Sequence, residues 1–128
     1  MQIDLNKYSE FVGAVTSNES KDLTTFMNRL DRLDGNYEAY GPNGEMQHGP
    51  DVNVPLLITA CFGLAAESGE FCEIPKQLLF NQAKLTEEKL IIMKSKLANL
   101  LFYWVTACNS LNISPNDILQ ENINKIAN

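Results

Sequence analysis

The sequence predicts an all-α protein of four or five helices packed as a bundle. Apolar residues recur at three- and four-residue spacing along most of the chain, which is the helical period. Two of the apolar runs directly follow residues that commonly cap helices. The 128 residues, 45% apolar and 20% charged, are typical of one soluble domain with a real core. We therefore expect a single domain over residues 1–128.

The N-terminal part, residues 1–52, is predicted to contain two short helices and a glycine-rich loop. The first helix is indicated by apolar residues at helical spacing, and the second by a similar pattern between residues 22 and 33. The apolar residues of the first are Leu5, Tyr8, Phe11, Val12 and Val15, and those of the second are Leu23, Phe26, Met27 and Leu30.

Residues 35–51, GNYEAYGPNGEMQHGPD, hold four glycines and two prolines and are predicted to form a long irregular loop. Loops of this length in compact domains are often functional or mobile. Tyr37 and Tyr40 are candidates to close over a ligand, with an ordinary surface loop as the alternative. His48 has no neighbouring Cys or second His, so we expect no metal there.

The remaining residues, 53–128, are predicted to form the core helices. A helix is expected from about residue 54 to 79, with Pro55 tolerated in its first turn. Pro75 should kink or interrupt this helix, because proline lacks a backbone N–H and clashes with the preceding turn. Thr86 is placed to cap the next helix, residues 87–111.

The helix over residues 87–111 carries an unbroken apolar stripe, widened by further apolar residues, so we expect protein to surround most of it. Its stripe consists of Leu90, Met93, Leu97, Leu100, Trp104, Cys108 and Leu111. The last helix should begin at Ser114, as N-cap, with Pro115 at its first position and Asp117 three residues after the cap.

Charge and cysteine content narrow the possible environments and partners. A net charge of −6 argues against nucleic acid and against an anionic membrane surface. No export signal is evident, and no run approaches the ~18 consecutive apolar residues of a membrane span. The three cysteines, Cys61, Cys72 and Cys108, form no CxxC pair, and we interpret them as buried thiols. A cytoplasmic protein is expected.

Two pairs of polar residues lie within the apolar helices of the second half. Glu67 and Glu70 are spaced i, i+3, on a face shared with Ala60, Gly63 and Ile74. On the next helix, Lys96, Asn99 and Tyr103 share a face beside the main apolar stripe. If these two helices are antiparallel neighbours, the faces meet, and paired carboxylates inside a bundle are a known divalent-metal site. On spacing alone, a solvated Glu-x-x-Glu edge is the more common outcome.

From LLITACFGLAAESGEFCEIPKQLLF through LANLLFYWVTACNSLNISPNDILQENINKIAN, the chain resembles the MazG-type all-α nucleoside triphosphate pyrophosphohydrolases. It is most similar to the short single-domain versions of phages and bacteria. The resemblance implies a Glu-x-x-Glu pair on one helix and a Glu-x-x-Asp pair on the next. Together these four carboxylates hold Mg²⁺, which activates water for attack between the α and β phosphorus atoms. The products are a nucleoside monophosphate and pyrophosphate.

Carried over residue by residue, the resemblance gives this chain only half of that metal site. Glu67 and Glu70 match the first pair, but in KLANLLFYWV Lys96 and Asn99 stand where the second Glu and Asp are expected. The net charge of the four positions changes from −4 to −1. A unit-charge pair at ~4 Å is worth about 4 kcal/mol at an effective dielectric of about 20, so most Mg²⁺ affinity should be lost.

The resemblance also places Asn122 and Lys125 of the last helix among nucleotide-binding residues. The leading hypothesis is therefore a protein that binds or sequesters a nucleotide or nucleotide-derived signal without hydrolysis, as a phage counter-defence sponge in the host cytoplasm would. No cofactor is expected under this hypothesis. Its ligand would contact Lys96, Asn99 and Tyr103, whose ring could stack on a base.

Two alternatives are open. An active Mg²⁺-dependent pyrophosphohydrolase would use Glu67 and Glu70 as catalytic metal ligands, with Glu73 as a possible third carboxylate. A structural or interaction bundle would instead use Lys96 only as an ion-pair partner. In every case the resemblance implies a homodimer or homotetramer, and broad apolar coverage of the two central helices agrees with self-association.

Overall fold

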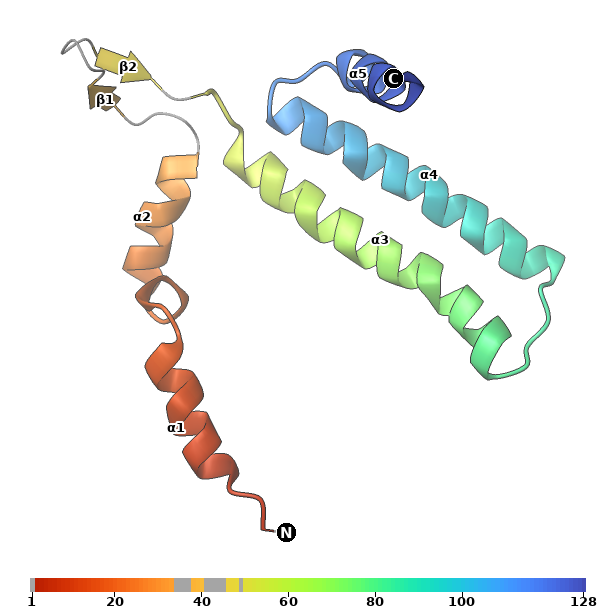
Figure 1. The fold of residues 1–128 in the computed structure, drawn as a ribbon, viewed down its shortest axis with the longest axis horizontal. Coiled ribbons are helices and arrows are strands. Elements are labelled where there is room, and N and C mark those ends of the chain that lie inside the picture. Colours follow the sequence, from red (N-terminus) through yellow and green to blue (C-terminus); the bar gives the residue numbers. More distant parts are fainter. Residues whose placement is uncertain (1, 34–37, 41–45, 49) are drawn as a thin grey trace. The chain divides into compact units, whose positions relative to one another are not determined.

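The computed structural model describes residues 2–33, 38–40, 46–48 and 50–128. Helices account for most of these residues, which confirms the predicted all-α class. The chain divides into two compact units, residues 1–49 and residues 50–128 (Figure 1). We call them the first and second units and describe each by itself.

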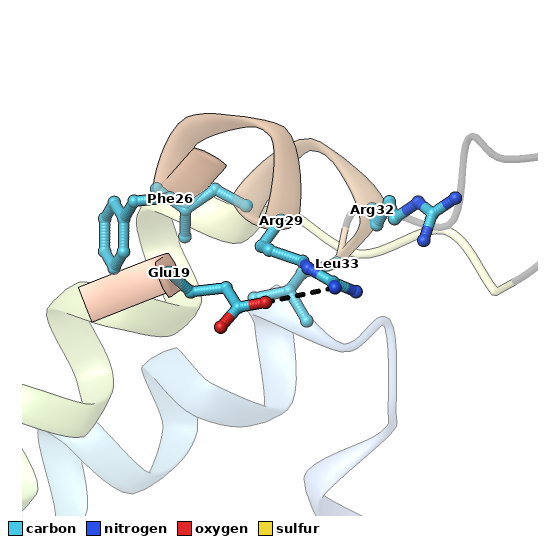
Figure 2. Close-up of a pocket in the computed structure, with 6 residues that line it drawn as sticks. Glu19, Phe26, Arg29, Arg32 and Leu33 are labelled. Atoms are coloured by element: carbon cyan, nitrogen blue, oxygen red, sulfur yellow. Dashed lines mark ion pairs between the residues drawn. The ribbon is translucent and has the colours of Figure 1, made fainter. Parts of the chain in front are cut away.

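The first unit contains α1 (Leu5–Val15), the short 3₁₀ helix η1 (Asn18–Ser20) and α2 (Leu23–Leu33). The two α-helices lie where the apolar spacing predicts them. An ion pair joins η1 to α2, because Arg29 Nη2 lies 3.1 Å from Glu19 Oε1 (Figure 2). Sequence spacing did not predict this pair, whose partners lie on different elements.

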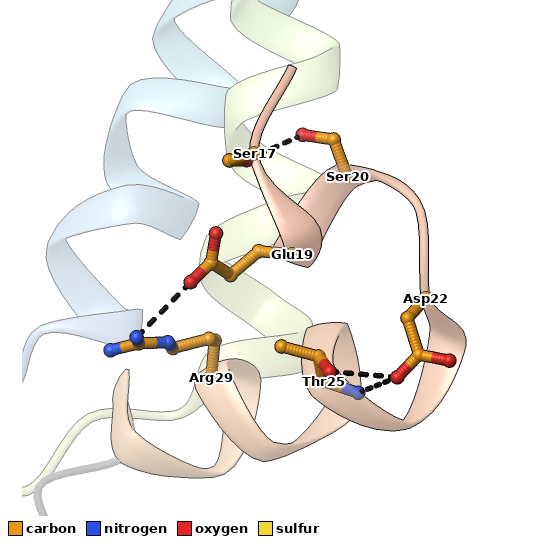
Figure 3. Close-up of polar contacts among 6 residues, drawn as sticks. All are labelled: Ser17, Glu19, Ser20, Asp22, Thr25 and Arg29. Carbon is orange, nitrogen blue, oxygen red and sulfur yellow. Dashed lines mark hydrogen bonds and ion pairs between the residues drawn. The ribbon is translucent and has the colours of Figure 1, made fainter. Parts of the chain in front are cut away.

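The N-terminus of α2 is held by a carboxylate. Asp22 Oδ2 accepts hydrogen bonds from the backbone N–H of Thr25 at 2.9 Å and from its hydroxyl at 2.7 Å (Figure 3). These two bonds favour the ionised carboxylate and lower the pKa of Asp22. The contact satisfies a backbone donor that the first turn of a helix otherwise leaves without a partner.

The prediction of a wholly irregular loop over residues 35–51 is wrong. Within it, β1 (Glu38–Tyr40) pairs antiparallel with β2 (Met46–His48), with Ala39 opposite Gln47. Strands of three residues are too short to show an alternating pattern, and glycine and proline are as common in hairpins as in loops. The backbones of Tyr40 and His48 lie in these strands, whereas Tyr37 is outside the described residues.

The second unit is organised around a helical hairpin. Its helices are α3 (Val54–Phe80), α4 (Glu87–Ser110) and α5 (Pro115–Ala127). α3 and α4 pack side by side and antiparallel, as a short connection favours (Figure 1). Asn53 caps α3 through the Leu56 N–H at 3.1 Å, and Thr86 caps α4 through the Lys89 N–H at 3.2 Å. Ser114 precedes α5 as predicted, but its side chain makes no capping hydrogen bond.

Backbone and side-chain hydrogen bonds close one end of the hairpin. The Asn53 N–H donates to the Ser110 carbonyl at 2.8 Å, and Asn112 Nδ2 donates to the Asp51 carbonyl at 2.9 Å. Asn112 has a φ of 54°, and the Ile113 N–H returns to the Cys108 carbonyl at 3.0 Å. This is a Schellman ending, for which asparagine is the usual substitute for glycine. The start of α3 is thereby tied to the end of α4.

Of the two outcomes expected at Pro75, a kink or an interruption, the interruption does not occur, since α3 continues through it to Phe80. Proline removes one hydrogen bond, and the bonds on either side persist in so long a helix. Pro75 is exposed, while the preceding Ile74 is buried. The packed side of the helix is therefore maintained while the proline ring faces solvent.

Burial within the chain is limited. Among the residues whose burial the structure describes, the buried side chains are those of Ala60, Ile74, Cys108 and Ser110. The expectation that protein surrounds the helix over residues 87–111 is wrong for the single chain. Its exposed large apolar residues include Ile91, Ile92, Leu97, Leu101 and Phe102. Cys61 and Cys72 are also exposed, so the prediction of buried thiols holds only for Cys108. Helical spacing shows which residues share a face, but not whether another element covers that face.

Among the described residues, α3 and α4 are both long and apolar enough to cross a membrane, judged by length and composition alone. The core helices of soluble proteins meet the same criterion. The cytoplasmic location therefore stays a prediction.

Candidate functional site

The two polar pairs predicted from the sequence meet across the α3–α4 hairpin. Lys96 on α4 hydrogen-bonds Glu70 on α3, and its Nζ lies 3.5 Å from Glu67 Oε2. Asn99 Nδ2 donates to the same Glu67 oxygen at 3.2 Å. The i, i+3 spacing on each helix and the antiparallel packing bring these four residues together. We call them the polar cluster.

Exposure differs between the two carboxylates. The Glu67 side chain is 16% exposed and receives both the Lys96 ammonium and the Asn99 amide. The Glu70 side chain is 55% exposed and has Lys96 as its partner. Glu67 is therefore the fixed acid of the polar cluster, and Glu70 is the one that can turn toward water.

Lys96 is the electrostatic centre of the polar cluster. Its hydrogen bond to Glu70 raises the pKa of the ammonium, desolvation opposes that change, and the charge of Glu67 reinforces it. Lys96 is therefore protonated throughout the neutral range. An ammonium that contacts two carboxylates supplies the positive charge that a cation would otherwise supply between them.

Tyr103 lies about one turn along α4 from Asn99, beside Gly63 of α3. Its ring packs directly on Gly63, so closely that a Cβ at that position would overlap the ring. Tyr103 is half-buried and makes an edge-to-face contact with Phe102, with ring centroids 5.2 Å apart. Gly63 therefore provides the space that brings Tyr103 onto the same hairpin face as the polar cluster.

Two predicted ligand-binding residues are not brought into the polar cluster. Asn122 and Lys125 are exposed on α5, and no hydrogen bond or ion pair joins either of them to the polar cluster within the described residues. α5 begins beyond the end of α4, and Lys96 is fourteen residues before that end, about 21 Å along the helix. Both residues stay candidates only through the family resemblance.

Glu73, the third carboxylate considered for a metal site, is not part of the polar cluster. Glu73 is 53% exposed and lies 3.7 Å from Lys76 on its own helix. Over the ranges that the structure describes, no group of three or more His, Cys, Asp or Glu side chains is arranged to hold a metal.

The polar cluster does not fit the Mg²⁺ that the family resemblance implies. Mg²⁺ prefers octahedral oxygen ligands, usually one or two carboxylates together with waters and substrate phosphates. Here both carboxylates are bound by Lys96, and Asn99 turns its N–H toward Glu67. A metal would have to displace the ammonium and overcome its repulsion.

The fold and the polar cluster define an all-α chain in which a lysine joins two acidic residues across a helical hairpin. No match to this chain is found among protein-family models, curated proteins or solved structures. Membership of the MazG-type family therefore stays a prediction from the motif residues.

Proposed function

We propose that this protein binds a nucleotide or a nucleotide-derived signal without hydrolysing it, at the hairpin face that carries the polar cluster. The observation that carries the proposal is that the Lys96 ammonium contacts both Glu67 and Glu70. The family resemblance implies a metal ion between carboxylates at these positions. Without the metal, the chain lacks the means to lower the pKa of an attacking water.

Charge supports a non-hydrolytic role. Two carboxylates, one ammonium and one amide carry a net charge of −1, compared with −4 for the metal-binding set. The protonated state of Lys96 makes this difference permanent at neutral pH. A phosphate-bearing ligand can then be bound through the ammonium, without a metal bridge.

A ligand phosphate would take the place of Glu70. This carboxylate is half-exposed and can turn into water, whereas Glu67 stays held by Asn99. Lys96 would exchange one carboxylate for one phosphate and remain paired throughout. The ring of Tyr103 on the neighbouring turn offers an apolar surface for a base or ribose.

Isothermal titration with nucleoside mono-, di- and triphosphates, cyclic nucleotides and ADP-ribose derivatives tests the proposal. We expect micromolar or tighter binding of at least one ligand that is unaffected by EDTA. Lys96→Met should weaken that binding by about tenfold or more, because a charge-assisted bond is lost. Lys94→Met, which removes an exposed lysine two residues away, is the matched control.

The enzyme alternative has its own readout. A pyrophosphate-release assay with Mg²⁺ and with Mn²⁺ should show no turnover above background. If the original chain shows turnover and Glu70→Gln abolishes it, the protein is an enzyme and the proposal of non-hydrolytic binding is wrong. Binding to none of the nucleotides by the properly folded oligomer would remove the ligand proposal.

A second candidate, a structural or interaction bundle, is favoured by one observation. Both carboxylates of the polar cluster are already paired with Lys96, so the cluster is stable without any ligand. The exposed apolar residues of α3 and α4 would be covered in a homodimer or homotetramer. Sedimentation of the original chain and of Lys96→Met separates the candidates. Unchanged assembly together with absent nucleotide binding in both proteins would favour the structural role.

A further inference from the structure

A second feature with binding character lies in the first unit, on elements that do not carry the polar cluster. A cavity of about 340 Å³ is lined by Glu19 of η1 and by one edge of α2 (Figure 2). Its other lining residues are Phe26, Arg29, Leu30, Arg32 and Leu33. We refer to its three apolar lining side chains as the floor and to its three charged lining side chains as the rim. Cavities of this volume are within the range that binds small ligands.

The rim of this cavity is positive in an acidic chain. Glu19 neutralises Arg29 through their 3.1 Å ion pair, and Arg32 forms no ion pair with any described residue. The pKa of Glu19 is lowered by backbone and Ser17 hydrogen bonds and by Arg29, against an opposing desolvation. Glu19 is therefore ionised at neutral pH, and the rim keeps a net charge of +1 in a chain of −6.

The acidic residues near the cavity that the structure describes form no ion pair with Arg32. Asp31 directly precedes Arg32 on α2, where successive side chains project about 100° apart around the helix axis, and Asp34 lies outside the described residues. Asp22 is engaged by Thr25 at the start of the helix (Figure 3). Within the described part of the chain, Arg32 is thus the cation lining the cavity that has no ion-pair partner.

We infer that this cavity binds a small amphipathic anion, with its apolar body against Phe26, Leu30 and Leu33 and its anionic head on Arg32. The apolar body supplies affinity by leaving water, and the head supplies orientation through a forked donor that matches carboxylate and phosphate oxygens. Arg29 is held at the same rim by Glu19 and can share the head group. The site is independent of the proposed nucleotide site, which lies on different helices.

Chemical-shift mapping on the ¹⁵N-labelled full chain tests the inference with four probes below their micelle concentrations. Octanoate and octyl phosphate carry both features, octanol lacks the charge, and inorganic phosphate lacks the apolar body. We expect the two amphipathic anions to shift amide resonances of residues 19–33, and octanol and phosphate to bind at least about fivefold more weakly. The ratio of octanoate to octyl phosphate affinity then identifies the preferred head group.

Variants locate the charge requirement. Arg32→Gln should weaken octanoate binding by about fivefold and leave octanol binding unchanged, while Arg32→Lys should retain most of the affinity. Lys7→Gln makes the same charge change on α1, outside the cavity, and should have no effect. The inference is overturned if octanol binds as tightly as octanoate, if the shifts lie outside residues 19–33, or if Arg32→Gln behaves like Lys7→Gln.

Discussion

The ring of Tyr103 on α4 lies directly on Gly63 of α3, so closely that a Cβ at this position would overlap the ring. No other residue type leaves room for the ring at this distance. We therefore expect Gly63→Ala to lower the free energy of unfolding by about 1–3 kcal/mol through overpacking. Urea unfolding followed by circular dichroism measures the change.

Gly69→Ala on the same helix is the matched control. A Cβ at Gly69 would meet no atom within 4 Å, so the methyl group has space. Alanine loses less backbone entropy than glycine in a helix, and Gly69→Ala should raise the free energy of unfolding by about 0.5–1 kcal/mol. Equal effects of the two substitutions would contradict the packing of Tyr103 on Gly63.

Lys96 should make the stability of the protein depend on pH in the alkaline range. Its pKa is raised in the folded chain, chiefly by the hydrogen bond to Glu70, so folding favours the protonated form. The stabilisation is fully present at neutral pH and is lost as the pH rises above about 10.4 and through the folded pKa. Between pH 7 and 12, the free energy of unfolding should therefore fall more steeply for the original chain than for Lys96→Met. Urea unfolding at a series of pH values measures this.

The comparison needs a control for the loss of a lysine outside the polar cluster. Lys94→Met removes an exposed lysine from the same helix and should retain the steep fall. If Lys94→Met and Lys96→Met reduce the pH dependence of the free energy of unfolding equally, the ion pairs of Lys96 are not its cause.

Restoring the carboxylates should create a metal site. The double variant Lys96→Glu with Asn99→Asp places four acids where the structure has two, and their repulsion should lower stability in EDTA. Mg²⁺ or Mn²⁺ should then raise the melting temperature. At a concentration one hundred times its Kd, the metal would stabilise the variant by about 2.7 kcal/mol. Differential scanning calorimetry with and without metal measures this.

The same charge change made elsewhere tests whether position matters. Lys94→Glu with Asn109→Asp alters two exposed residues of α4 and should show no metal-dependent stabilisation. The original chain should behave like this control. Mg²⁺ binding by the original chain as tight as that of the double variant would show that Lys96 does not exclude the metal.

Protonation of Asp22 at low pH should weaken its hydrogen bonds to Thr25 at the start of α2. Its pKa is lowered by the hydroxyl and amide of Thr25, so its contribution to stability is present above the ordinary aspartate value of about 3.9. The contribution is lost as the pH falls through the lower, folded pKa. The Thr25 amide resonance, followed from pH 6 to 2, should move with a midpoint below that ordinary value.

Asp22→Asn keeps an oxygen that can accept the same bonds but does not titrate. In this variant the Thr25 amide should show little change with pH. A midpoint at or above the ordinary aspartate value in the original chain would contradict the contacts of Asp22 seen in Figure 3.

Much of the helical architecture could be predicted because it depends on local sequence. The apolar spacing predicted α1 and α2, and Thr86 predicted the start of α4, since period and capping are properties of neighbouring residues. The extent of α3 was predicted closely, but whether Pro75 interrupts it could not be decided in this way. It depends on the length of the helix and on Ile74 being buried while the proline faces solvent.

The candidate site, too, could be predicted only in part from the sequence. The i, i+3 spacing predicted that Glu67 pairs with Glu70 on one helix face and Lys96 with Asn99 on another, because helical geometry follows from the sequence alone. That one ammonium contacts both carboxylates depends on the packing of α3 against α4. The ion pair of Glu19 with Arg29 depends likewise on a turn between two elements. Local spacing determined the faces, and tertiary packing decided which charges meet, since electrostatic energy depends on separation in space.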